Sequence, residues 1–109
     1  MAVESVLILS SDTNLLLVPV DKSYAVTTIF VNNYASSTAS SNDSSFDMHV
    51  VKNLQTKNNS NKVINNMSMP AQETFVLNME RLVLDEGDKI VLTSPDSDKL
   101  SATVSYLEV

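Results

Sequence analysis

The stretch RLVLDEGDKIVLT, residues 81–93, gives the clearest indication of the fold class of this 109-residue chain. Two short apolar runs, Arg81–Leu84 and Lys89–Thr93, flank a turn that holds the only glycine of the sequence. The turn residues are Asp85, Glu86, Gly87 and Asp88. Glycine adopts left-handed backbone angles without the steric penalty of a Cβ atom. The segment therefore predicts a β-hairpin with Gly87 in its turn.

The same pattern of short apolar or alternating runs continues in both directions from this segment. The runs are rich in Val, Ile, Thr, Phe and Tyr, and clusters of Asn, Asp, Ser and Pro separate them about every ten residues. This spacing is typical of all-β domains and predicts a single antiparallel β-sandwich or jelly-roll of about eight strands. The expected strands are Ser5–Leu9, Leu15–Val20, Tyr24–Val31, Phe46–Lys52, Lys62–Asn65, Glu73–Asn78, Arg81–Leu84, Lys89–Thr93 and Ser101–Glu108.

Length and composition predict one domain that covers residues 1–109. A chain of this length can bury enough surface to fold without a disulfide or a structural metal, and it contains no cysteine. Residues 1–20 hold two apolar runs that Glu4 and Asp12 interrupt, and no positively charged region precedes them, so we expect neither a signal peptide nor a membrane span. These twenty residues are expected to form an edge strand or an arm that contacts a neighbour.

The formal charge of −6 excludes two classes of partner. The basic residues are scattered singly along the chain, whereas proteins that neutralise phosphates present a basic face. We therefore expect no nucleic-acid ligand, and the same argument excludes anionic membrane surfaces.

The predicted strand Phe46–Lys52 carries the only histidine of the chain. Phe46 and Met48 share one face of this strand, while Asp47 and His49 share the other, which predicts a half-exposed strand. Without cysteine or a second histidine, His49 cannot form a recognisable zinc site, and no orienting partner for a general base is visible. We interpret His49 as a half-exposed structural residue and expect no catalytic residue, metal or cofactor.

Two acidic turns raise the question of calcium binding. Asp85, Glu86 and Asp88 could supply oxygen ligands, but their spacing differs from that of an EF-hand loop. Because Asp and Gly favour turns without any metal, a solvated turn is the preferred interpretation. The segment Ser94–Asp98 receives the same interpretation, and Pro95 predicts the tip of a second hairpin there.

Two polar loops, Asn32–Ser45 and Gln55–Asn61, are long for so small a domain, and such loops are often functional. Their amides and hydroxyls could bind a sugar, although the chain has no Trp to provide an aromatic platform. The candidate interaction residues are Asn32, Asn33, Tyr34, Asn42, Asn58 and Asn59.

Four segments together resemble small virion structural proteins of tailed bacteriophages. They are YAVTTIFVNN (24–33), FDMHVV (46–51), LVLDEGDKI (82–90) and ATVSYLE (102–108). In that class a strand that ends near an Asn is followed by a variable polar loop, and an L-x-x-G-D-x-I hairpin precedes the last strand. The resemblance covers about three-quarters of the chain, but residues 1–20 match nothing in it.

The resemblance implies a non-enzymatic structural protein of a virion, assembled in the host cytoplasm. The expected role is to bind and stabilise a capsid, neck or tail assembly, most simply as a decoration or cement protein. Its partners would be the major capsid protein or other virion proteins, and a homo-oligomer such as a trimer is expected. The alternative is a glycan- or receptor-binding module of a tail fibre or tail tip.

Overall fold

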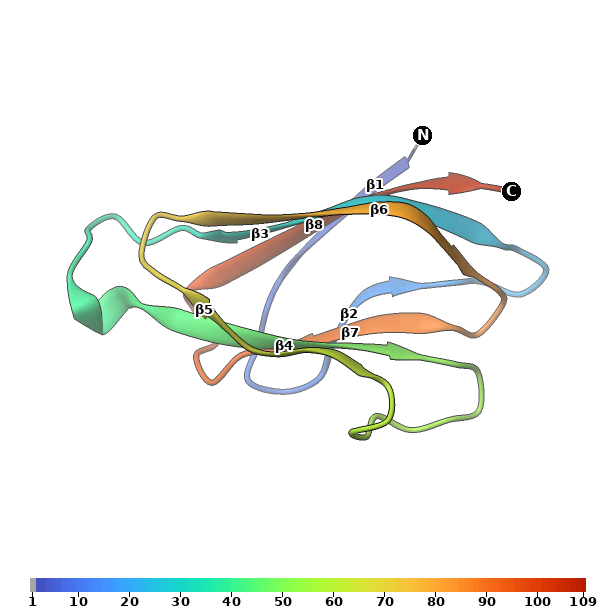
Figure 1. Ribbon diagram of the computed structural model, residues 1–109, viewed down its shortest axis with the longest axis horizontal. Coiled ribbons are helices and arrows are strands. Elements are labelled where there is room, and N and C mark those ends of the chain that lie inside the picture. The colour runs from blue at the N-terminus through green and yellow to red at the C-terminus, as the bar shows by residue number, and fades with distance from the viewer. Residues whose placement is uncertain (1) are drawn as a thin grey trace.

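The computed structural model describes residues 2–109, apart from the side chains of Glu80 and Arg81, as two four-stranded antiparallel sheets that pack face to face (Figure 1). Sheet A has the order β1 (Ala2–Leu7), β8 (Leu100–Glu108), β3 (Tyr24–Asn33) and β6 (Thr74–Leu84). Sheet B has the order β2 (Thr13–Leu17), β7 (Lys89–Thr93), β4 (Ser44–Val51) and β5 (Lys62–Met69). A single 3-10 turn, η1 (Ser40–Asn42), precedes β4. The predicted all-β sandwich is confirmed.

The strand order 1-8-3-6 over 2-7-4-5 is that of an eight-stranded jelly roll. Consecutive strands alternate between the sheets, and among the described residues only the β4–β5 connection stays within one sheet. The chain therefore passes back and forth across the core, and the first strand pairs with the last.

The two predicted hairpins are therefore wrong, although both turns are present. β6 lies in sheet A and β7 in sheet B, so the turn at Gly87 carries the chain from one sheet to the other. The turn at Ser94–Asp98 likewise joins β7 to β8 across the two sheets. Turn chemistry specifies a local reversal, but the sheet that the next strand joins depends on long-range pairing.

Several strand boundaries also differ from the prediction. The segments Glu73–Asn78 and Arg81–Leu84, predicted as two strands, form the single strand β6. Its pairing with β3 shifts between Asn78 and Leu82, and this irregularity absorbs the residues that looked like a break. By contrast, β7 begins and ends at the predicted residues.

The hydrophobic core lies between the two sheets because alternate residues of each strand point inward. Ile29 and Val104 of sheet A and Met48 and Ile90 of sheet B are almost completely buried there. The rings of Phe46 in β4 and Phe75 in β6 lie 5.9 Å apart and connect the sheets.

The first described residues of the N-terminal segment form strand β1 within this domain. It is the edge strand of sheet A and pairs with β8 of the same chain from Ala2 opposite Tyr106 to Leu7 opposite Ser101. Met1 lies outside the described residues. No helix in the described part of the chain is long and apolar enough to cross a membrane.

Candidate functional site

Among the residues whose side chains the structure describes, fifteen form four cross-strand rows on the outer face of sheet A; Glu80 and Arg81 of β6 lie outside this description. Residues that lie opposite each other on neighbouring strands point to the same side of a sheet, so the pairing register defines the rows. The rows are Leu7–Ser101–Asn32–Thr74, Ser5–Thr103–Phe30–Val76, Val3–Ser105–Thr28–Asn78 and Leu107–Ala25–Val83. We call these fifteen residues the uncharged face.

None of the fifteen residues carries a charge, although 18% of the chain is charged. Phe30 lies near the centre of the face and is 42% exposed, which is unusual for so large an apolar side chain. Val3, Leu7 and Val76 are exposed around it. Charge depletion together with a central aromatic side chain is typical of the core of a protein–protein interface.

Many polar groups of the uncharged face hydrogen-bond to one another. The hydroxyls of Ser5 and Thr103 lie 2.9 Å apart, and the Thr74 hydroxyl donates to Asn32 Oδ1 at 3.0 Å. At the irregularity of β3, the Thr27 and Ser105 hydroxyls are 2.6 Å apart. Because the hydroxyls of Ser5, Thr103, Thr74 and Ser105 already have partners, covering the face would not leave these four groups without a hydrogen bond.

The outer face of sheet B is charged instead. Lys57, in the loop between β4 and β5, forms an ion pair of 2.6 Å with Asp12, and Lys62 lies 3.7 Å from Asp47. The backbone N–H of Asn66 donates to Asp47 Oδ1 at 2.6 Å. The described side chains on the two outer faces of the sandwich therefore differ sharply in charge.

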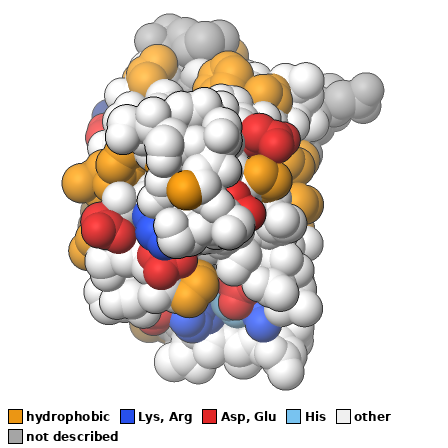
Figure 2. Space-filling model, turned by 90° about the vertical axis from the view of Figure 1, so that its left-hand side faces the viewer, with side chains coloured by type: hydrophobic (Ala, Val, Ile, Leu, Met, Phe, Trp, Pro, Cys, Tyr) orange, Lys and Arg blue, Asp and Glu red, His pale blue; other side chains and the backbone are white. Residues whose placement is uncertain are grey.

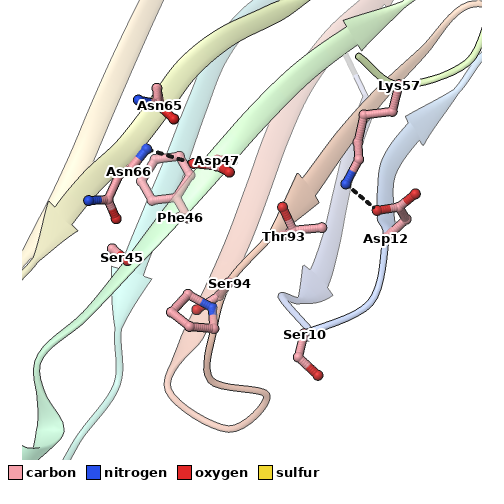
Figure 3. A pocket seen from close by; sticks show the side chains of 11 residues that line it. Ser10, Asp12, Ser45, Phe46, Asp47, Lys57, Asn65, Asn66, Thr93 and Ser94 are labelled. Atoms are coloured by element: carbon pink, nitrogen blue, oxygen red, sulfur yellow. Dashed lines mark hydrogen bonds and ion pairs between the residues drawn. The ribbon is translucent and has the colours of Figure 1, made fainter. Parts of the chain in front are cut away.

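A shallow groove of about 480 Å³ runs over this charged side (Figure 3). In Figure 3, Asn65, Asn66 and Asp47 form one wall and the Lys57–Asp12 pair forms the other, with Thr93 of β7 between them. Ser10, Ser45 and Ser94 supply the remaining polar lining, and the aromatic ring in the lining, Phe46, is itself buried. The groove offers hydrogen-bond donors and acceptors but no exposed aromatic platform among the described residues that line it.

His49 points to the outer face of sheet B as predicted, but the prediction of half exposure is wrong, because only 3% of its surface is accessible. The β4–β5 loop explains this burial. Its Lys57 reaches Asp12 beside β2, so the loop crosses over β7 and covers His49 and Val91. Burial lowers the pKa of His49, and the nearby Lys57 and Lys62 ammonium groups lower it further.

The predicted interaction residue Asn33 is buried and has a structural role. Its Nδ2 donates to the carbonyl oxygens of Asn42 and Met69, both at 2.9 Å, and its Oδ1 accepts from the N–H of Ala35 at 3.1 Å. Asn33 therefore anchors the β3–β4 loop to β5. The Asn42 amide is likewise used inside the loop, where it donates to Ser37.

The other predicted loop residues have mixed surroundings. Tyr34 is 44% exposed, Asn32 belongs to the uncharged face, and Asn59 is exposed. Asn58 stabilises its own loop, since its Oδ1 accepts from the N–H of Ser60 at 2.8 Å and its Nδ2 donates to Thr56 O at 3.0 Å.

The two polar loops each contribute one residue to the groove: Ser45, the last residue of the first predicted loop, and Lys57 of the second. One loop precedes β4 and the other follows it, so they leave this eight-residue strand at opposite ends (Figure 1), but Lys57 of the second loop reaches back to Asp12. The end of the molecule that faces the viewer in Figure 2 shows white surface interspersed with charged and hydrophobic side chains. A small ligand in the groove could therefore contact a residue of each loop.

The acidic turn directs its carboxylates to its own backbone and to neighbouring donors. Asp88 accepts the N–H of Asn53 on Oδ1 and the N–H of Asp85 on Oδ2, both at 2.9 Å. Asp85 accepts the Ser23 hydroxyl at 2.9 Å, while Glu86 is exposed. In the described part of the chain, no three His, Asp or Glu side chains are grouped closely enough to hold a metal ion.

Neither surface was predicted from the sequence. The alternation of apolar and small polar residues in β3 and β8 was visible, but the uncharged face emerges only when the register aligns four strands. No protein-family model matches the chain, and no curated protein or solved structure is significantly similar to it.

Proposed function

We propose that this protein is a non-enzymatic structural component of a bacteriophage virion, which binds and stabilises a capsid, neck or tail assembly as a decoration or cement protein. The observation that carries the proposal is the uncharged face, a broad surface without charge on its described side chains and with the exposed Phe30 near its centre. The resemblance of the β3, β4 and Gly87 segments to small virion proteins of tailed phages supports the proposal that the assembly is a bacteriophage virion.

The architecture is compatible with this role. Jelly rolls form viral capsid domains and also lectin domains, so the fold supports two classes of function without choosing between them. The choice therefore depends on surfaces, and the surface best suited to a protein partner is the uncharged face around Phe30.

The test is whether the chain is a stoichiometric part of purified particles. Quantitative mass spectrometry of gradient-purified particles of the phage that encodes the chain should find it at a fixed number of copies per particle, retained through a high-salt wash. Immunogold labelling should place it at one location on the particle. Absence from purified particles, or a variable trace amount, would reject the proposal.

The groove on sheet B favours glycan or receptor binding by a tail fibre or tail tip as a second candidate function. Its Asn and Ser side chains match the hydroxyls of a sugar, although the groove lacks an exposed aromatic side chain among its described residues. Binding on a glycan array that Asn65→Ala abolishes and Asn59→Ala preserves would support this candidate. An array without signal would reject it.

A further inference from the structure

We infer that the uncharged face is the contact surface for a second copy of this chain, so that two sandwiches pack sheet A against sheet A around a two-fold axis. The inference rests on the proposed function, because it takes this face as an assembly interface and names its partner.

The net charge of the chain and the lack of charge on the fifteen side chains of this face together favour a second copy as the partner. Each copy carries a formal charge of −6, so two copies repel each other wherever carboxylates would meet. The four rows of the uncharged face contribute no charge at all. These fifteen described side chains offer no ion pair to an acidic or a basic partner, and they fit a surface that is equally uncharged. The same face of another copy meets this requirement.

The size of the face suits a stable dimer. With strands about 4.8 Å apart and residues about 3.3 Å apart along each strand, the four rows cover roughly 20 by 25 Å in projection. A pleated face with protruding side chains has more accessible surface than its projection, which brings it near the ~800 Å² per partner of a standard interface. Face-to-face packing of aligned sheets is also the arrangement that β-sandwiches already use internally.

The position of Phe30 favours a two-fold axis. β8 and β3 are the two central strands of sheet A, and Phe30 lies in the second row, directly opposite Thr103. An isologous contact centred there places the Phe30 rings of both copies in the middle of the interface, where anchor residues contribute most. The two-fold arrangement also closes the contact, so it forms dimers rather than filaments.

Two valine variants of the full chain test this inference. Val76 in edge strand β6 belongs to the uncharged face and is 46% exposed, and Val63 in edge strand β5 points out from sheet B and is 55% exposed. Val76→Glu places a charge in the proposed contact, while Val63→Glu makes the same change on the opposite sheet. Circular dichroism and thermal unfolding establish that both variants are folded.

Sedimentation equilibrium should show a wild-type mass of about twice 11.9 kDa at ~10–100 μM, above the micromolar Kd of a weak interface of this size. Val76→Glu should weaken the dimer at least ~10-fold, because it buries unpaired carboxylates, and Val63→Glu should leave it unchanged. A monomeric wild type, or equal dimerisation of both variants, would overturn the inference.

The absence of cysteine from the chain permits a second measurement. Thr103→Cys places a thiol next to Phe30, and Val63→Cys places one on the other sheet. A short bis-maleimide linker should join two copies of the first variant and not of the second. Cross-linking through Val63→Cys alone would overturn the inference.

The outcomes separate this inference from the proposed function. A chain that is monomeric alone but stoichiometric in particles would reject the two-fold dimer and keep the virion role. A chain that dimerises through sheet A but is absent from purified particles would keep the two-fold dimer and reject the virion role.

Discussion

Gly87 is the residue whose replacement has the most direct structural consequence. Its φ is +80°, and a Cβ atom at this position would lie 2.3 Å from Cγ of the Asn53 side chain. Gly87→Ala should therefore lower the free energy of unfolding by about 1–3 kcal/mol, through backbone strain and this contact. Urea denaturation measures the loss. Glu86→Ala, in the same turn but exposed, serves as the control, and equal stability of the two variants would contradict the assignment.

We expect the free energy of unfolding to depend on pH through His49, because this side chain is buried without a full set of hydrogen-bond partners among the described residues. Its Nδ1 has no hydrogen-bond partner among the described residues. The groups that act on its charge are the ammonium groups of Lys57 and Lys62, which lower its pKa after burial, and the carboxylates of Asp47 and Asp12, which partly oppose them. The net pKa lies below the ordinary value of 6.5.

The sign of the pH dependence follows from this shift. Below pH 6.5 the unfolded chain binds a proton on His49 that the folded chain does not yet bind, so stability falls as pH decreases through this range toward the lowered pKa. Wild-type unfolding free energy should fall from about pH 7.5 to about pH 5.5, by at most ~1.4 kcal/mol per pH unit, while His49→Gln should be nearly flat. Parallel profiles for the two proteins would contradict this account.

At the scale of elements, β1 should be the least protected strand of sheet A. Five of its six residues are exposed and only Val6 is partly buried, so opening β1 exposes little apolar surface. Hydrogen exchange should show the amides that join β1 to β8 at least ~10-fold less protected than those that join β8 to β3. Equal protection would mean that β1 opens only when the whole domain unfolds.

The elements also show what sequence patterns can and cannot predict. β7 was predicted at its observed bounds and β3 from its first residue, because alternation and turn residues are local signals. The pairing of β6 with β3, and not with β7 across the Gly87 turn, is a long-range property. The burial of His49 depends in the same way on where the β4–β5 loop crosses. The uncharged face of sheet A and the groove on sheet B could be identified only once the strand register of the whole sheets was known.

At the scale of the whole molecule, the contrast between the two faces predicts how the dimer responds to salt. The uncharged face provides no ion pair for salt to screen, whereas the net charge of −6 makes the copies repel. Between about 50 mM and 500 mM NaCl the Kd of the dimer should stay within ~3-fold or become tighter. Weakening of more than ~10-fold, measured by sedimentation, would point to the ion pairs of sheet B as the contact.

The crossing connections determine when this chain can fold. Ala2 pairs opposite Tyr106, so β1 can take its place in sheet A only after β8 has been made. Loop closure over such distances makes folding slow, in the millisecond-to-second range typical of β-sandwiches. Sheet A is completed only after β8 has been made, and the surface that we infer to join two copies forms together with it.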